Sequence, residues 1–270
     1  MNIPVNHLKE SIKAGKTVYG AWLECANPAI AEIAGLVGYD FVIIDQEHGL
    51  GDVTSAIEMM RALSGTKTTA VIRVPSDSPH YIKRILDAGA QALIIPMVDT
   101  AAQADAIVKS CYYPPYGVRG NAAPAVRASR YGLIPDYIDQ ANESLMIIPQ
   151  IESVTAVNNA REIASVHGVD MVFIGPADLS GSAGFPSCTN SPEAERLIQH
   201  TFEVVKSTGK PVGTCPRDGK SVSDLYHQGF NLIAANSDIN TISSAFAGYM
   251  NDWRRLSGDN AHAIEAKRYS

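Results

Sequence analysis

The stretch FVIIDQEHGLGD, residues 41–52, passes from four apolar side chains directly into Asp45, Glu47 and His48 and then into a glycine-containing turn. A continuous apolar run, without alternating polar positions, is typical of a parallel strand that is buried on both faces. The stretch therefore predicts a buried parallel strand that carries three ionisable side chains at its tip.

Runs of this kind recur along the whole chain, and most are rich in valine and isoleucine. They cover residues 18–24, 41–46, 69–75, 92–98, 145–152, 171–176, 211–216 and 231–237. Helix-like segments separate them, at residues 27–38, 52–65, 77–89, 100–111, 191–209, 221–229 and 239–255. Eight strands that alternate with helices over about 250 residues predict an α/β fold, a (β/α)8 TIM barrel, with residues 1–270 as a single domain.

A doubly wound open sheet is the main competing fold, but it usually carries a Gly-rich phosphate turn after its first strand. The corresponding turn here reads LECANPA and lacks the G-x-G-x-x-G pattern. The sequence AGKT at 14–17 resembles the end of a P-loop, yet Glu10 occupies the position of the required earlier glycine. Both nucleotide-binding interpretations are therefore rejected.

Two segments fall outside the strand–helix rhythm. Residues 112–144 are rich in Pro, Tyr and Arg, and we expect a long functional βα-type excursion there rather than a linker to another domain. Residues 256–270 form a polar C-terminal tail that we expect to be frayed.

Composition excludes several classes of partner. A net charge of -6 and a pI near 5.6 disfavour nucleic-acid binding. No apolar run reaches the roughly 18 residues of a membrane helix, and the N-terminus lacks an apolar core of signal-peptide length. Scattered cysteines without a C-x-x-C pair predict free thiols in a reducing, cytoplasmic setting. They are Cys25, Cys111, Cys188 and Cys215.

Polar residues gather where the predicted strands end, and in a barrel these ends form the reaction face. They are Trp22, Glu24, Asp45, Glu47, His48, Arg73, Gln150, Glu152, Asp178, Cys215, Asn236 and Asp238. Gln150 and Glu152 are two residues apart and so face the same side of a strand. Glu152 and Asp178 end neighbouring strands, and two carboxylates without a cysteine favour Mg²⁺ or Mn²⁺. The structural alternative is that both are ordinary salt-bridge partners of Arg73 or Arg119.

Three further features are consistent with a reaction at this face, and each has a structural alternative. Asp45 is close enough to orient the His48 imidazole as a base, although turn histidines are common. Arg73 must meet an anion, which is either a protein carboxylate or a substrate oxygen. The sequence IGPADLS at 174–180 places Gly175 and Pro176 at a helix start that can bind a carboxylate, but an ordinary turn and N-cap would look the same.

The chain closely resembles the HpcH/HpaI aldolase family from about residue 8 to residue 250. The motifs that carry the resemblance are FVIIDQEHG, VIRVP, LDAGAQALIIPMV, YYPPYGVRG, PQIES and VFIGPADLS, in this order. The family consists of metal-dependent, pyruvate-utilising aldolases, including 4-hydroxy-2-oxoheptanedioate aldolase, with macrophomate synthase as a fungal relative.

The resemblance implies a barrel of the phosphoenolpyruvate/pyruvate-binding type. It also implies a hexamer, a trimer of dimers, with exchanged C-terminal helices. Glu152 and Asp178 would hold Mg²⁺, Mn²⁺ or Co²⁺, which chelates the carboxylate and keto oxygen of pyruvate. The backbone at Gly175, Pro176, Ala177 and Asp178 would hold that carboxylate, with Gln150 close by.

By the same resemblance, Arg73 stabilises the enolate and aldol oxygens, and the His48–Asp45 pair is the base, acting through a metal-bound water. Trp22 and Cys215 shape the aldehyde pocket. Family members often have a bulky aliphatic residue at the position of Cys215, and AANSD replaces the more usual AVGSD near the eighth strand. These departures leave the aldehyde open.

The expected reaction is the reversible cleavage of a 4-hydroxy-2-oxo acid to pyruvate and an aldehyde. No lysine stands among the strand-tip residues, which disfavours a Schiff base. The alternatives are oxaloacetate decarboxylation, a macrophomate-synthase-like condensation on the same site, and a catalytically inactive binding barrel.

Overall fold

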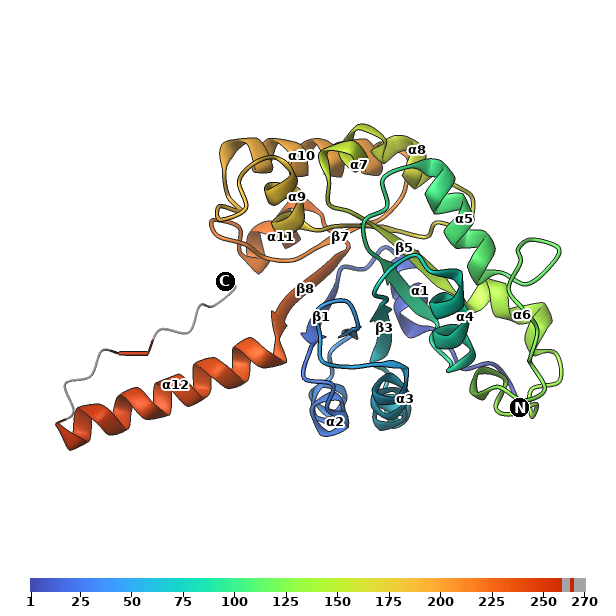
Figure 1. The fold of residues 1–270 in the computed structure, drawn as a ribbon, viewed down its shortest axis with the longest axis horizontal. Coiled ribbons are helices and arrows are strands. Elements are labelled where there is room, and N and C mark those ends of the chain that lie inside the picture. Colours follow the sequence, from blue (N-terminus) through green and yellow to red (C-terminus); the bar gives the residue numbers. More distant parts are fainter. Residues whose placement is uncertain (259–262, 265–270) are drawn as a thin grey trace.

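The computed structural model describes residues 1–258 and 263–264. Eight strands, each parallel to its neighbours, close into a barrel in the order β1 to β8 (Figure 1). Their bounds are β1 Val18–Leu23, β2 Phe41–Asp45, β3 Thr69–Arg73, β4 Ala92–Ile95, β5 Met146–Ile151, β6 Val172–Ile174, β7 Val212–Thr214 and β8 Leu232–Ser237. The predicted (β/α)8 barrel is confirmed, and all eight predicted strands are present.

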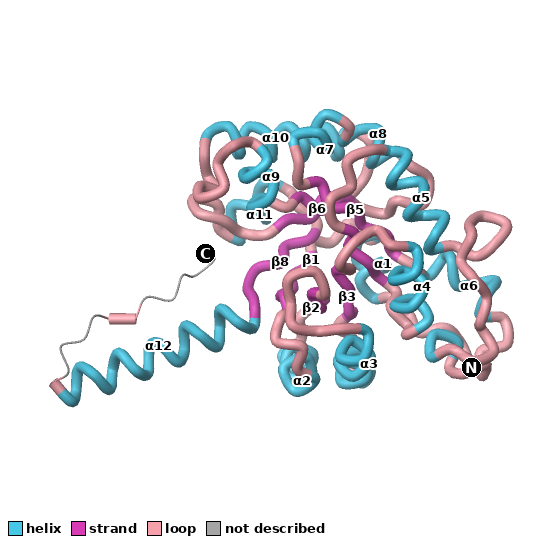
Figure 2. The backbone as a smooth tube through the Cα atoms, in the orientation of Figure 1, coloured by secondary structure: helices cyan, strands magenta, loops and turns pink. Residues whose placement is uncertain are grey.

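Helices surround the strands (Figure 2). Their bounds are α1 His7–Lys13, α2 Pro28–Val37, α3 Val53–Ala62, α4 Pro79–Asp87, α5 Ala101–Cys111, α6 Tyr137–Ser144, α7 Val154–Asn158, α8 Ala160–Ser165, α9 Pro176–Ser182, α10 Pro192–Ser207, α11 Val222–Gln228 and α12 Asp238–Ser257. Two 3-10 turns, η1 Leu63–Gly65 and η2 Arg127–Ser129, complete the set. Every helix-like segment of the sequence is helical, whereas α1, α6, α7 and α8 were not predicted, because at five to eight residues they are too short to establish a period.

Local signals in the sequence set the helix ends. The Asn27 side chain accepts a hydrogen bond from the Ala29 N–H at the start of α2, and Pro28 is the first helical residue. Gly38 ends α2 with a φ of 95°, a left-handed conformation that glycine adopts without steric cost. These two capping residues therefore fix where α2 begins and where it ends.

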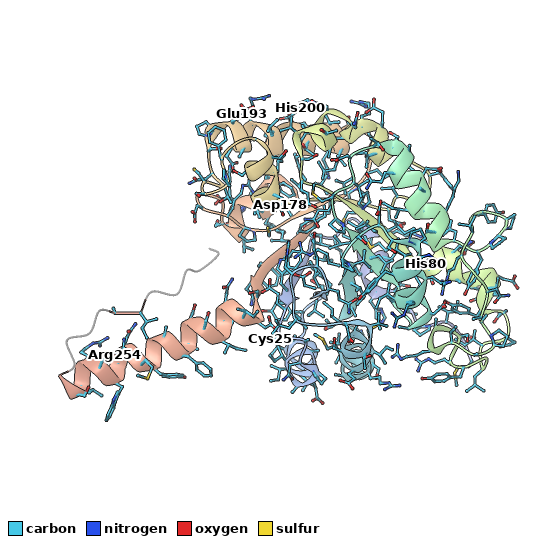
Figure 3. All side chains as sticks on the ribbon, in the orientation of Figure 1. Cys25, His80, Asp178, Glu193, His200 and Arg254 are labelled. Atoms are coloured by element: carbon cyan, nitrogen blue, oxygen red, sulfur yellow. The ribbon has the colours of Figure 1, made fainter. Side chains whose placement is uncertain are left out.

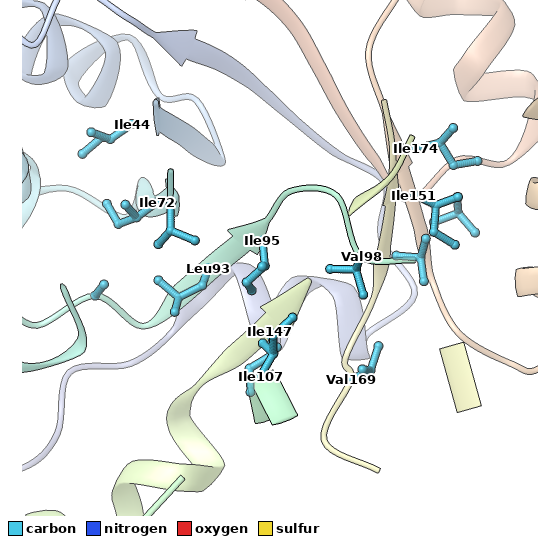
Figure 4. Packing of buried hydrophobic residues seen from close by; sticks show 14 of the residues in the cluster. Ile44, Ile72, Leu93, Ile95, Val98, Ile107, Ile147, Ile151, Val169 and Ile174 are labelled. Atoms are coloured by element: carbon cyan, nitrogen blue, oxygen red, sulfur yellow. The ribbon is translucent and has the colours of Figure 1, made fainter. Parts of the chain in front are cut away.

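The strands bury both faces, which explains why their sequences are apolar without alternation. Phe41 and Ile43 point into the barrel, whereas Val42 and Ile44 pack against the surrounding helices. Figure 4 shows part of the outer layer, with Ile44 and other aliphatic side chains between strands and helices. Leu8 of α1 belongs to the inner cluster, so α1 closes the barrel at the N-terminal ends of the strands.

Residues 112–144 connect α5 to β5, at the N-terminal ends of the strands. The prediction of a βα-type excursion is therefore wrong, because βα loops leave the opposite ends. The segment contains η2, α6 and a small core in which the Arg119 guanidinium lies 4.5 Å from the centre of the Tyr113 ring. Arg119 also forms an ion pair with Asp87, at 2.7 Å.

Helix α12 extends away from the barrel (Figure 1). Of its twenty residues, only Asp238 and Ala247 are buried. The helix runs through Ser257, so the first two residues of the predicted frayed tail, 256 and 257, are helical. Residues 259–262 and 265–270 of that tail lie outside the described residues. Within the described part of the chain, no helix combines the length and apolar character needed to cross a membrane.

A substitution at Gly20 tests how closely β1 packs against β2. The Cα of Gly20 lies opposite Phe41, and a Cβ added there would lie 2.4 Å from the Phe41 carbonyl oxygen and 2.6 Å from its ring. We expect Gly20→Ala to lower the free energy of unfolding by about 1–3 kcal/mol, because the Phe41 ring is fully buried and cannot move freely. Urea unfolding measures this, with Gly65→Ala as the control, since a Cβ at Gly65 meets no atom within 4 Å. Equal stability of the two variants would contradict the packing.

Candidate active site

The predicted site residues converge at the C-terminal ends of the strands. Strand pairing places Asp45 opposite Arg73 at the ends of β2 and β3, and Gln150 opposite Phe173 in β5 and β6. Figure 3 labels Asp178, which stands at the start of α9 directly after β6. The sequence signal of polar strand tips thus corresponds to one polar cluster at the mouth of the barrel.

A buried ion pair joins the ends of β2 and β3. The Arg73 Nε donates to Asp45 Oδ1 at 2.8 Å, and Nη2 donates to Oδ2 at 2.6 Å. The guanidinium also lies 4.5 Å from the centre of the Trp22 ring, and its Nη1 lies 3.1 Å from Glu47 Oε2. Burial alone would raise the pKa of Asp45, but the hydrogen bonds and charge of Arg73 outweigh it and lower that pKa. Asp45 therefore remains ionised and fixes the direction of the guanidinium.

Glu152 is a buried carboxyl group with a strongly shifted pKa. Glu152 directly follows β5 in the chain and is 2% exposed. Its Oε1 atom accepts a hydrogen bond from the Met97 N–H at 2.7 Å. Gln150 Nε2 donates to the other oxygen, Oε2. Burial, together with the negative charges of Asp178 and Glu47, raises the pKa of Glu152 to about 7. A positive ion beside this carboxyl group would oppose the shift, because it favours the ionised form.

Gly175 allows the start of α9 to approach the Glu152 carboxylate. A Cβ at this position would lie 2.7 Å from Glu152 Oε2 and 2.6 Å from Gln150 Nε2. Asp178, two residues into α9, is exposed and acts electrostatically on both Glu152 and Glu47. The glycine thus brings a second carboxylate toward the first without a steric clash.

The residues present fit a hard divalent cation. Both carboxylates are oxygen donors, and the Gln150 Oε1 atom is buried without a hydrogen-bond partner. Within the described part of the chain, no three His, Cys, Asp or Glu residues are grouped closely enough to hold a metal ion. A site formed by Glu152 and Asp178 would accordingly leave coordination positions open to substrate and water.

The structure relates His48 and Asp45 differently from the predicted pair. Asp45 Oδ1 accepts the backbone N–H of His48 at 3.4 Å, while both carboxylate oxygens are held by Arg73. The His48 imidazole is 62% exposed, and its Nε2 lies 3.9 Å from Glu47 Oε2. The acid next to the imidazole is therefore Glu47, and the role of His48 as base stays a prediction.

Glu47 was noted at the strand tip but was not assigned a role in the site. Burial raises its pKa, with Asp45 and Asp178 contributing in the same direction, while Arg73 and His48 oppose the rise. Its Oε2 atom is buried and has no hydrogen bond of good geometry. The signal in the sequence was its place just after the strand, where a turn in which the Glu47 N–H donates to Asp45 Oδ1 brings the two residues together.

Trp22 and Cys215 flank the guanidinium of Arg73. The Trp22 ring packs edge-on against Phe173, with 5.9 Å between ring centres. Burial raises the pKa of the Cys215 thiol to about 11, although Arg217 and Arg73 both oppose that rise. The thiol is therefore neutral at ordinary pH, and its place in the aldehyde pocket stays a prediction. Sequence reasoning missed Arg217, which is 4% exposed and pairs through its Nε with Glu195 Oε1 at 2.5 Å.

Comparisons with known proteins point to one family. The sequence profile described as HpcH/HpaI aldolase/citrate lyase matches residues 18–245. A 5-keto-4-deoxy-D-glucarate aldolase of Klebsiella pneumoniae is 39% identical over 89% of this chain and 93% of its own. A hydroxypyruvate/pyruvate aldolase of Agrobacterium fabrum is 38% identical over 92% of this chain and 95% of its own.

Solved structures agree with these relatives. An HpcH/HpaI aldolase/citrate lyase family protein from Burkholderia cenocepacia superposes with a TM-score of 0.88 at 32% identity, covering 93% of this chain and all of that one. Macrophomate synthase superposes with a TM-score of 0.79 at 26% identity, over 95% of this chain and 90% of its own.

Gly175 provides a test of the two-carboxylate site. We expect Gly175→Ala to weaken Mn²⁺ binding by about tenfold or more, because the added methyl group forces Glu152 or α9 to move. Mn²⁺ binding measured by electron paramagnetic resonance reports the change. Gly181→Ala, on the same helix, is the matched control, since its Cβ would meet only Pro186, at 4.0 Å. Unchanged Mn²⁺ affinity in Gly175→Ala would argue against metal binding between Glu152 and α9.

The raised pKa of Glu152 predicts that metal binding displaces a proton. Below its folded-state pKa of about 7 the carboxyl group is protonated and must ionise to bind a cation, so affinity rises with pH and levels off above that value. Calorimetry in two buffers of different ionisation enthalpy should show release of about one proton per Mn²⁺ near pH 6 and almost none near pH 8.5. Identical proton release at both pH values would contradict this assignment.

Proposed function

Because the chain belongs to the HpcH/HpaI aldolase/citrate lyase family and is thus an enzyme, we propose that it is a divalent-metal-dependent, class II aldolase. Its substrates would be 4-hydroxy-2-oxo acids, cleaved reversibly to pyruvate and an aldehyde. The observation that carries the proposal is the pairing of Glu152 and Asp178 beside the buried guanidinium of Arg73. The names of the relatives, which are aldolases of keto-deoxy sugar acids and of pyruvate, support it.

Glu152 and Asp178 would hold the cation, either Mg²⁺, Mn²⁺ or Co²⁺. When bound, the cation would act as a Lewis acid toward the carboxylate and keto oxygen of the 2-oxo acid. The N–H groups of Ala177 and Asp178 at the start of α9 have no partner within the helix, and they would receive the substrate carboxylate. Pro176 has no N–H, so its contribution is the fixed backbone that starts this turn.

Arg73 would stabilise negative charge at two stages of the reaction, on the oxygen at C4 and on the enolate oxygen of pyruvate. Asp45 and the Trp22 ring hold its guanidinium in place before the substrate arrives. Such preorganised donors are effective because they need no reorientation when charge develops. His48, exposed at the mouth with Glu47 beside it, would remove the proton of the C4 hydroxyl group, after which the C3–C4 bond breaks.

A second candidate is a different carbon–carbon lyase on the same site, namely an oxaloacetate decarboxylase or a macrophomate-synthase-like enzyme. The structural similarity to macrophomate synthase supports this second candidate. All these reactions would form a pyruvate enolate, and Arg73 would stabilise the negative charge of its oxygen. Steady-state rates on oxaloacetate and on a panel of 4-hydroxy-2-oxo acids distinguish the candidates.

Metal removal tests the class of mechanism. We expect EDTA to abolish pyruvate release from a 4-hydroxy-2-oxo acid, and Glu152→Gln to lower kcat by about a hundredfold or more, because the carboxylate charge is lost. A lactate-dehydrogenase-coupled assay measures pyruvate. Borohydride added with pyruvate should leave the protein unmodified by mass spectrometry. Activity that survives EDTA together with a borohydride-trapped lysine would replace this mechanism with a Schiff base.

The exposed face of α12 supports the expected assembly, a hexamer with exchanged C-terminal helices. Apolar side chains recur along α12 at intervals of four and three residues, which places them on one stripe. They are Ile242, Phe246, Tyr249, Trp253 and Leu256. The barrel offers a complementary exposed apolar surface on α2, formed by Ile33, Leu36 and Val37. We also expect a cytoplasmic enzyme, since all four cysteines are free thiols.

A charge on the α12 stripe should disrupt the assembly. We expect Trp253→Asp to shift the protein from a hexamer to smaller species in size-exclusion chromatography with light scattering, because the exposed indole would lie in the subunit interface. Asn240→Asp introduces the same charge on the opposite side of α12 and should leave the mass unchanged. A wild-type monomer would contradict the exchanged-helix assembly.

A further inference from the structure

A cavity of about 240 Å³ lies at the end of the barrel opposite to the candidate active site. The segment before α1, the end of α3, the start of β3, the residues before β4 and β5, and η2 all contribute to its lining. The N-terminus and the segment before α6 lie together in this region (Figure 1). The inner apolar cluster of the barrel, which includes Leu8 and Phe173, separates the cavity from the catalytic end.

Two guanidinium groups line this cavity, and a third belongs to the residue that follows the lining residue Met60 in the chain. Arg127 and Arg130 line it, and Arg61, in the last turn of α3, acts electrostatically on Arg127. Among the described residues, none of the three has an ion-pair partner. Burial, with the repulsion of Arg61 and Arg130, lowers the pKa of Arg127. Like charges close together repel one another, so an anion bound among these arginines would be stabilising.

The cavity can accept such an anion. Arg127 Nη1 donates to the Ala88 carbonyl oxygen at 2.7 Å, which fixes this guanidinium against the barrel. Arg130 is exposed and has a left-handed backbone with a φ of 56°, and its guanidinium makes no hydrogen bond among those found for the described residues. Apolar and backbone groups form much of the remaining wall, including Met60, Leu63 and Leu145. The guanidinium donors are therefore available to a ligand.

Other groups at the cavity do not neutralise the arginines. The acid nearest to the lining residue His7 is Glu10, whose Oε2 lies 3.7 Å from His7 Nδ1 and which is itself exposed. The hydroxyl groups of Thr66 and Thr68 donate to backbone carbonyl oxygens. The volume is below the roughly 300–1,000 Å³ of sites for drug-sized ligands, so a small ion fits better.

We propose that this guanidinium pocket, lined by Arg127 and Arg130 with Arg61 next to the lining residue Met60, binds a small, multiply charged oxyanion, namely phosphate or the phosphate group of a small metabolite. Planar guanidinium groups bind such oxygens in pairs and are never deprotonated at ordinary pH. The bound anion would join the end of α3 to η2, and so would tie the segment 112–144, which contains η2, to the barrel. The site is separate from the reaction and does not depend on the proposed function.

Calorimetry on the full chain tests the proposal. We expect inorganic phosphate to bind once per subunit and acetate at equal ionic strength not to bind, because a single charge cannot balance the cluster. Arg130→Gln and Arg61→Gln should each weaken phosphate binding about tenfold or more. Both arginines are exposed, so these variants should fold, whereas Arg127 also supports the Ala88 carbonyl group. Arg161→Gln, at an exposed arginine on α8, is the matched control and should bind phosphate normally.

Two further arms identify the site and the ligand. Glu152→Gln should bind phosphate with unchanged affinity, since phosphate at the candidate active site would respond to that change. Glycerol 3-phosphate, as a phosphate monoester, should bind as tightly as inorganic phosphate or more tightly if the natural ligand is a metabolite, and more weakly if it is the free ion. The absence of phosphate binding, or binding that is insensitive to both Arg130→Gln and Arg61→Gln, would overturn the proposal.

Discussion

The buried pairing of Arg73 with Asp45 is the interaction on which the catalytic end of this barrel depends. The two residues are opposite one another at the ends of β2 and β3, and two hydrogen bonds join them. Loss of one partner from such a pair typically costs about 3–5 kcal/mol, because the other charge stays buried. The pair therefore holds two strand ends in register and also fixes the direction in which the guanidinium faces its other neighbours.

Around this pair the charges do not balance. Arg73 is one cation beside the carboxyl groups of Asp45, Glu47, Glu152 and Asp178, so full ionisation would leave three uncompensated negative charges. Burial is the main cause of the raised pKa values of Glu47 and Glu152, and the excess of negative charge adds to it. Protons can relieve the excess, and a divalent cation bound as proposed would relieve it while leaving the carboxylates ionised.

The sequence determines much of this arrangement, because strands buried on both faces leave a continuous apolar signature and their polar tips stand out against it. What it does not reveal depends on contacts between strands. Asp45 is three residues from His48 and 28 from Arg73 along the chain, yet the register of β2 and β3 gives its carboxylate to Arg73. The prediction that residues 112–144 form a βα-type excursion rested on their length and composition. These properties do not show at which end of the barrel a segment lies, and this one connects α5 to β5.

Helix α1 covers the barrel at the N-terminal ends of the strands. Leu8 and Ile12 pack beneath the side chains that fill the barrel, so a substrate reaches the polar strand ends only from the catalytic end. When a site opens on one side only, the ligand that is bound deepest leaves last. Under the proposed reaction the 2-oxo acid, held by the start of α9, would lie beneath the aldehyde. The order of product release would then follow from this one-sided access, with the aldehyde leaving first and pyruvate second.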